Sequence, residues 1–212
     1  MTDRSDIKVY PSTAPAAVFV LAHGAGAGQS SPFITAFARG MAERGITTAT
    51  FDFPYIAAGR KVPDRAPVLE AHWLRIIELT RSQVPAVPLF IGGKSMGGRI
   101  ASQVAAGDHP PIAGLVFLGY PLHPPGRPDK LRDAHLPSIA EPMLFVQGTR
   151  DTFGTTAEIR ALLPRMQKAT LREVAGGDHS FKVSGTKAKP AEVMAGIMNV
   201  VADWMKAATV RP

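Results

Sequence analysis

Residues 87–106, VPLFIGGKSMGGRIASQVAA, decide the fold, because an apolar run changes here into a glycine-rich turn and then into a helical pattern. Residues 87–92 are apolar without alternation, which is typical of a parallel strand buried on both faces. Residues 95–106 are rich in small helix-forming side chains. Strand followed by helix is the repeating unit of layered α/β folds, so this stretch predicts such a fold.

The rest of the chain repeats the same alternation. Further strands are expected at residues 16–22, 46–51, 112–119, 142–148 and 169–174, and further amphipathic helices at residues 33–44, 68–84 and 191–207. Right-handed crossovers place helices on both faces of such a sheet. The sequence therefore predicts an α/β protein: a three-layer α/β/α sandwich with a mainly parallel sheet of about six or seven strands, with residues 1–212 as one domain.

Residues 120–141, YPLHPPGRPDKLRDAHLPSIAE, interrupt this alternation. The segment is rich in proline and polar side chains, and it is too short for a separate domain. We expect a long loop with one short helix near residues 130–135. Loops of this length in a compact domain are often functional, so this loop is a candidate to line a site.

Composition limits the class of protein. With 45% apolar and 19% charged residues, the chain is ordinary for a globular protein. The net charge of +7 comes from scattered Lys and Arg, which indicates a solvated surface and no nucleic-acid partner. The absence of cysteine excludes disulfides, thiolate metal sites and a cysteine nucleophile. A polar N-terminus and the lack of a long apolar run predict a cytoplasmic protein without a membrane partner, either monomer or homodimer.

Ser95 is the candidate nucleophile, because residues 93–97 match G-x-S-x-G between a strand and a helix. Such a turn holds the serine in a strained conformation at a helix N-terminus, where the dipole favours negative charge. The backbone N–H of Met96 is then one expected oxyanion donor. A phosphate-binding loop would need glycine where Pro88 stands, and it is rejected. A turn that serves only packing stays open at this point.

A second glycine-rich loop, residues 23–28, follows the first long strand. Gly24 or Ala25 is expected to supply the second oxyanion N–H, and His23 to anchor the loop. The rival interpretation is a dinucleotide fingerprint, since Asp52 ends the next strand. It is disfavoured because Gln29 occupies the place of the third glycine.

Asp151 and His179 each follow one of the last two expected strands, at the edge of the sheet where sites form. Asp151 is the candidate acid and His179 the candidate base; the alternative for Asp151 is to cap a helix that starts near Thr155. Asp178 is the weaker candidate acid, because side chains of adjacent loop residues rarely face each other. Nucleophile, acid and base occur in the order Ser, Asp, His, as in α/β-hydrolases.

The stretches AHGAGAG, FDFPY, GGKSMGGR, LGYPLHPPG, HLPSI, QGTRDTFG and GGDHSF, spread over about residues 7–206, resemble a known group. The chain is similar to the small α/β-hydrolases without a lid that are called dienelactone-hydrolase-like or testis-expressed-30-like predicted hydrolases. The resemblance implies the roles given above to Ser95, Asp151 and His179. Dienelactone hydrolases use a cysteine nucleophile, so their substrate is not inherited, and the usual cap domain is absent.

These residues predict hydrolysis of small carboxylic esters without a metal or organic cofactor, His179 acting as general base for Ser95 and Asp151 orienting it. A thioesterase, an amidase, an acyltransferase or a non-catalytic interaction module on the same fold are the alternatives. An apolar substrate pocket is expected from side chains just past strand ends or beside the triad: Phe53, Tyr55, Tyr120, Leu122, Phe153 and Phe181.

Overall fold

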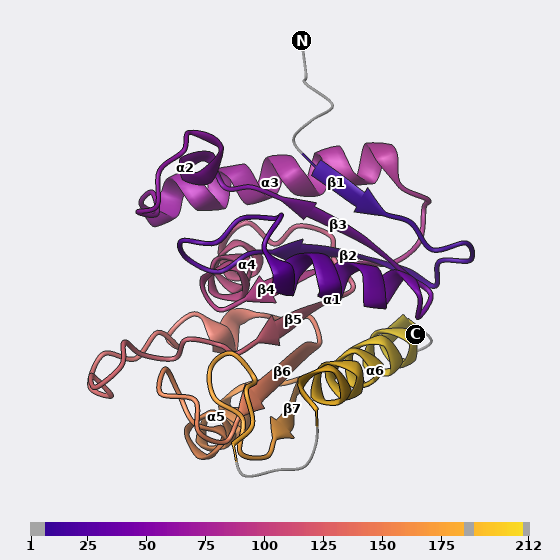
Figure 1. Ribbon diagram of the computed structural model, residues 1–212. Coiled ribbons are helices and arrows are strands. Elements are labelled where there is room, and N and C mark those ends of the chain that lie inside the picture. Colours follow the sequence, from indigo (N-terminus) through magenta and orange to yellow (C-terminus); the bar gives the residue numbers. More distant parts are fainter. Residues whose placement is uncertain (1–6, 185–188, 210–212) are drawn as a thin grey trace.

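The computed structural model describes residues 7–184 and 189–209, and the remainder of the predicted domain lies outside the described residues. Seven strands form one sheet in the order β1-β3-β2-β4-β5-β6-β7, in which only the β1–β3 pair is antiparallel (Figure 1). The strands are β1 (Ile7–Tyr10), β2 (Ala17–Ala22), β3 (Ile46–Phe51), β4 (Leu89–Lys94), β5 (Gly114–Leu118), β6 (Met143–Gly148) and β7 (Ala169–Val174).

Helices cover both faces of the sheet, which confirms the predicted three-layer architecture. Helices α1 and α6 lie on one face, and α3 and α4 on the other (Figure 1). The helices are α1 (Pro32–Ala42), α2 (Pro54–Ala57), α3 (Ala66–Gln83), α4 (Met96–Gly107), α5 (Thr156–Leu162) and α6 (Pro190–Thr209), with 3₁₀ turns at Leu136–Ser138 and Leu163–Arg165.

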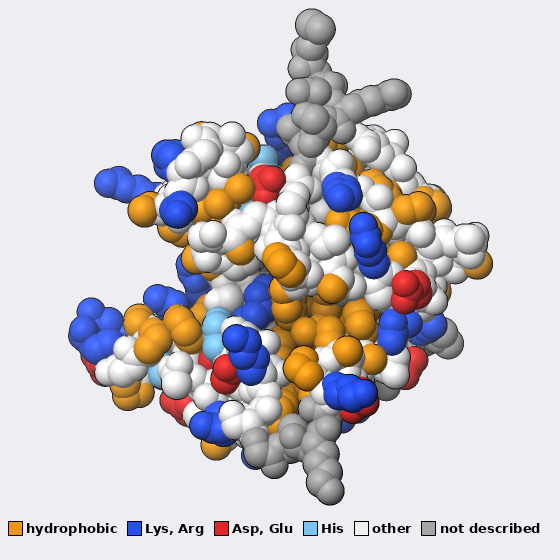
Figure 2. All heavy atoms as spheres, viewed as in Figure 1, with side chains coloured by type: hydrophobic (Ala, Val, Ile, Leu, Met, Phe, Trp, Pro, Cys, Tyr) orange, Lys and Arg blue, Asp and Glu red, His pale blue; other side chains and the backbone are white. Residues whose placement is uncertain are grey.

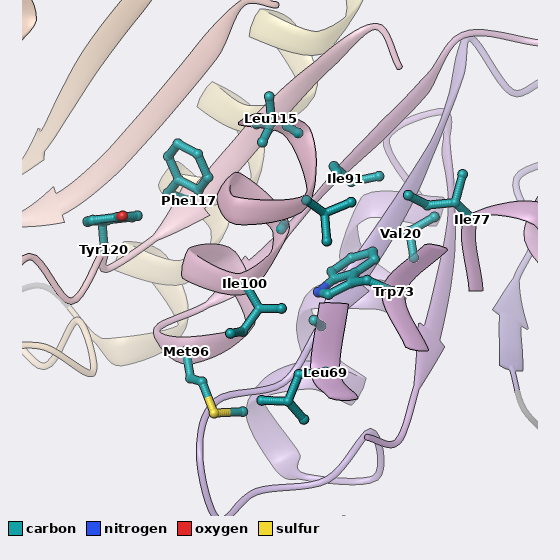
Figure 3. Packing of buried hydrophobic residues seen from close by; sticks show 14 of the residues in the cluster. Val20, Leu69, Trp73, Ile77, Ile91, Met96, Ile100, Leu115, Phe117 and Tyr120 are labelled. Atoms are coloured by element: carbon teal, nitrogen blue, oxygen red, sulfur yellow. The ribbon is translucent and has the colours of Figure 1, made fainter. Parts of the chain in front are cut away.

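Each face of the sheet has its own apolar core, because successive strand residues point to opposite faces. On β2, Val18 and Val20 pack toward α3 and α4, whereas Phe19 and Leu21 pack toward α1 and α6. Figure 3 shows the first core, in which Trp73 of α3 lies beside the strand and α4 side chains. Strands buried on both faces account for the apolar runs without alternation.

Some local structure differs from what the sequence predicts. The edge strand β1 was not predicted, because its four residues are too few for a reliable periodicity. The helix expected near residues 130–135 is wrong: the loop has its 3₁₀ turn at Leu136–Ser138 instead. Hydrogen bonds to distant backbone explain this, since Arg132 N–H donates to the Leu122 carbonyl and the Arg132 carbonyl accepts from the Tyr120 hydroxyl.

None of the helices formed by residues 7–184 and 189–209 has both the length and the hydropathy needed to cross a bilayer.

Candidate active site

Ser95 lies at the sharp turn between β4 and α4. Its backbone angles are φ 50° and ψ −119°, a conformation that side-chain-bearing residues rarely adopt. The Ser95 N–H donates to the Leu118 carbonyl (3.1 Å), which holds the turn against β5. This is the strained strand-to-helix turn predicted from the sequence.

The glycines around Ser95 leave space for close backbone contact. A Cβ added at Gly97 would lie 2.6 Å from the His23 oxygen and 2.7 Å from the Ala22 Cβ. A Cβ at Gly93 would collide with the backbone oxygen of Ala22. The turn therefore packs directly against the end of β2, which a side chain at either position would prevent.

His179 connects Ser95 to Asp151. Its Nε2 lies 2.9 Å from the Ser95 Oγ, and its Nδ1 lies 2.8 Å from the Asp151 Oδ2. A carboxylate only accepts hydrogen bonds, so Nδ1 carries the proton and Nε2 is left to accept from the serine hydroxyl. The three side chains come from turns after β4, β6 and β7, and the fold brings them into one hydrogen-bonded chain.

Asp151 is completely buried and accepts three hydrogen bonds. Its Oδ1 accepts from the Phe153 N–H (2.8 Å), and its Oδ2 accepts from the Gln147 Nε2 (3.0 Å) as well as from His179. The helix-cap alternative is wrong, because Thr155 caps α5 with its own side chain in a capping box with Glu158.

Gln147 was missed by the sequence analysis. It is buried near the end of β6, where its Oε1 accepts from the Tyr120 N–H and its Nε2 donates to the Gly154 carbonyl and to Asp151. It thus ties the loops after β5 and β6 together. The only signal in the sequence was one polar residue at the end of an otherwise apolar strand.

The loop at residues 23–28 lies beside the nucleophile. A Cβ added at Gly24 would be 3.6 Å from the Ser95 Cβ. His23 fixes this loop, since its Nδ1 donates to the Gly24 carbonyl (2.8 Å) and its Nε2 accepts from the Phe53 N–H (3.2 Å). Burial lowers the pKa of His23, which agrees with a neutral ring that uses both nitrogens. Met96, the first residue of α4, has a backbone N–H without an acceptor inside the helix.

Asp52, the acidic residue of the rival dinucleotide interpretation, is half-buried and already accepts hydrogen bonds from within the protein. Its Oδ1 accepts from the backbone N–H of Gln29 (2.7 Å), and its Oδ2 from the Gln29 side chain (3.2 Å). Gln29, which stands where the dinucleotide fingerprint needs a glycine, is thus also the residue that donates hydrogen bonds to both oxygens of Asp52.

The pocket prediction needs correction for five of its six residues, whose side chains are buried and offer almost no surface to a substrate: Phe53, Tyr55, Tyr120, Leu122 and Phe181. Closeness to a strand end did not reveal that these side chains point into the core. Phe153 is partly exposed, and its ring lies over His179 with 4.2 Å between ring centroids. Phe153 is therefore the one predicted pocket residue that is both partly exposed and in contact with the His179 ring.

A second serine–histidine pair lies in α4 and the 120–141 loop. The Ser102 Oγ is 2.8 Å from the His135 Nε2, but its single proton goes to the Arg99 carbonyl (2.7 Å). His135 must then donate to Ser102 and cannot take its proton. This pair therefore lacks the arrangement that would activate a hydroxyl.

The carboxyl ends of the parallel strands point to one side of the molecule (Figure 1). On that side, Figure 2 shows a broad notch between the segment around α2 and the 120–141 loop, with Lys and Arg along it. A separate cavity of about 300 Å³ lies between β7 and α6, and neither Ser95, Asp151 nor His179 lines it.

The α/β-hydrolase class of fold is defined by a three-layer sandwich with a strained serine after a central strand of its sheet. Aspartate and histidine follow later strands of the same sheet, as they do here. The chain belongs to the alpha/beta hydrolase domain family, whose model matches residues 15–206. This membership confirms the resemblance stated above and classes the chain as a hydrolase.

Solved structures agree on the fold. An α/β serine hydrolase without a lid from Xanthomonas campestris superposes with a TM-score of 0.74 at 19% identity, covering 98% of this chain and 90% of that one. A dienelactone hydrolase from Anabaena variabilis gives 0.71 at 19%, with 96% and 93% covered. The protein Est1E from Butyrivibrio proteoclasticus, with bound ferulic acid, gives 0.74 at 13%, with 97% and 96% covered.

Proposed function

We propose that this protein hydrolyses small carboxylic esters through an acyl-enzyme on Ser95. The observation that carries the proposal is the hydrogen-bonded chain from the Ser95 Oγ through His179 to Asp151, with distances of 2.9 and 2.8 Å. The strained backbone of Ser95 adds to it, since such strain is concentrated at functional sites.

In the proposed reaction, the Ser95 Oγ attacks the ester carbonyl carbon while His179 Nε2 takes the hydroxyl proton. Asp151 holds the proton on Nδ1 and stabilises the imidazolium that forms. His179 then donates the proton to the leaving alcohol as the carbon–oxygen bond breaks. Water, activated by the same histidine, releases the acid and restores Ser95.

The oxyanion of the tetrahedral intermediate is proposed to bind the Met96 N–H and an N–H of Gly24 or Ala25. Met96 begins α4, so its N–H is not used within the helix and the helix dipole favours negative charge there. Gly24 lies close enough to the Ser95 side chain for its loop to reach the same oxygen. Each such donor typically contributes about 10²–10³ in rate.

Short acyl groups are the proposed substrates. The side chains of Ser95 and His179 are partly exposed, and five of the six apolar candidates for an acyl pocket are buried in the core. Phe153, above the His179 ring, is left as the apolar contact for a small substrate. An esterase domain occurs among the structural neighbours, but at 14% identity its substrate does not carry over.

The test is hydrolysis of p-nitrophenyl acetate, butyrate, octanoate and palmitate by the full chain. We expect the highest kcat/KM for acetate or butyrate, and at least a 10³-fold loss in Ser95→Ala. Ser102→Ala is the matched control, because it removes a hydroxyl that also contacts a histidine. Equal rates for Ser95→Ala and the wild type would exclude the proposed nucleophile.

A further inference from the structure

Lys94, the residue between Gly93 and Ser95, places an ammonium inside the protein next to the proposed active site. Its Nζ is buried and has no hydrogen-bond partner among the residues that the structure describes. The ammonium lies over the ring of Phe181, 5.6 Å from the ring centroid. Burying a charge without a partner is costly, so its position calls for a compensating interaction nearby.

The space around Gly119 reveals what the ammonium faces. A Cβ added at Gly119 would lie 3.1 Å from the Lys94 Nζ, 3.3 Å from the His179 carbonyl oxygen and 3.4 Å from the Asp151 Oδ2. Gly119 has φ +69°, a conformation that favours glycine, so this small space stays free of a side chain. The ammonium therefore shares one gap with the carboxylate of the proposed acid, Asp151, and with the backbone carbonyl of His179.

Two carboxylates lie near His179, one bonded to its ring and one on the preceding residue. Asp151, after β6, lies 2.8 Å from its Nδ1, and Asp178, after β7, is its neighbour in the chain. Negative charge near an imidazole favours its protonated form. A proton on Nε2 would prevent His179 from accepting the hydroxyl proton of Ser95. The Lys94 ammonium lies near the Asp151 carboxylate, and the charges of Asp151 and Asp178 both favour its protonated form.

We propose that Lys94 is a positioning residue whose ammonium offsets these two carboxylates and so keeps the His179 imidazole free of a proton and able to act as a base. Lys94 acts through Asp151 and His179 and touches no substrate. The contribution of Lys94 to catalysis rests on the proposed ester hydrolysis. The effect of its charge on the protonation of His179 is independent of that function.

Burial lowers the pKa of Lys94 to about 8, against the attraction of Asp151 and Asp178. The ammonium is thus charged at neutral pH and below, which is the range where an imidazole ordinarily takes up its proton. The stem of Lys94 also packs under the 23–28 loop, since a Cβ at Gly24 would lie 3.8 Å from its Cγ. An apolar side chain of the same length can fill that place.

The test follows the protonation of His179 by NMR in the full chain with ¹⁵N-labelled histidine, its signals assigned by their loss in His179→Gln. In Lys94→Met, the midpoint of the titration is expected to rise by about one pH unit. Lys94→Arg keeps the charge and is expected to stay near the wild type, as is the exposed control Lys168→Met. The same midpoint in wild type and Lys94→Met overturns the proposal.

Asp178→Asn supplies an independent arm that does not depend on the folding of a Lys94 variant. It removes one carboxylate but keeps an oxygen for the Ser180 and Lys182 N–H groups that Asp178 Oδ1 binds, so the midpoint is expected to fall. If the titration midpoint of His179 is unchanged or raised in Asp178→Asn, the proposed balance between Lys94 and the two carboxylates is contradicted. In Lys94→Met, the acid limb of kcat/KM for p-nitrophenyl acetate should move with the NMR midpoint. If the wild type hydrolyses no ester, the proposed function fails while the NMR result still decides the role of Lys94.

Discussion

Gly97 shows how single residues determine the geometry around Ser95. Gly97→Ala would put a methyl group 2.6 Å from the His23 oxygen, so β2 or α4 must shift. We expect a loss of about 1–3 kcal/mol in the free energy of unfolding, as for overpacked sites, and lower esterase activity. Gly107→Ala is the matched control in the same helix, because a Cβ there meets nothing within 4 Å. Urea unfolding should find this control unchanged or slightly more stable.

Asp151 determines which nitrogen of His179 carries the proton. In Asp151→Asn the amide can donate to Nδ1, which moves the ring proton to Nε2, where it faces Ser95. We expect kcat for p-nitrophenyl acetate to fall about 10³–10⁴-fold with little change in the melting temperature. Asp108→Asn, at an exposed position after α4, should retain full activity. A loss below tenfold in Asp151→Asn would argue against its proposed role.

At the scale of elements, the short helix α5 begins with a capping box. Thr155 caps α5 by accepting from the Glu158 N–H (3.3 Å), and Glu158 accepts in return from the Thr155 N–H (2.7 Å). Thr155→Ala removes one side of this capping box, and unfolding free energy is expected to drop by about 1 kcal/mol. Chemical denaturation measures this against Thr152→Ala, an exposed threonine outside the helix. Equal losses in the two variants would rule out capping as the cause.

The elements most easily predicted from the sequence were those buried on both faces. The six parallel strands lie within two residues of their expected bounds. Five of them are covered on both faces, which favours apolar runs, whereas the edge strand β7 carries exposed Arg172 and Glu173. Segments held by distant contacts were not predicted. The 120–141 loop takes its course from bonds such as that between the Tyr120 hydroxyl and the Arg132 carbonyl, and local sequence does not encode them.

The same distinction applies to the site. The residue types and chain order at Ser95, Asp151 and His179 follow from motif and strand ends, and the structure brings these three together. The prediction of the pocket residues was wrong for five of six side chains, because the direction of a side chain past a strand end depends on what packs above it. Gln147 and Lys94 act through buried contacts between several loops, for which a single sequence gives almost no signal.

At the scale of the whole molecule, the buried His23 and the half-buried His135 couple stability to pH. Burial lowers the pKa of His23 and of His135, so the folded protein binds fewer protons there than the unfolded chain does below about pH 6.5. Stability is therefore expected to fall as the pH decreases from 7.5 to 5.5, with a lower urea midpoint. His135→Gln should weaken this dependence, whereas exposed His109→Gln should leave it unchanged. A urea midpoint that does not change with pH would contradict the burial of neutral histidines.

The central claim, that this fold activates Ser95 as a nucleophile, is tested most directly by covalent labelling. The full chain is incubated with a fluorophosphonate, its intact mass is measured, and the modified peptide is mapped. The account predicts a single adduct on Ser95 in the wild type and in Ser102→Ala, and none in Ser95→Ala. No adduct on folded wild-type protein, or an adduct that persists in Ser95→Ala, would contradict it.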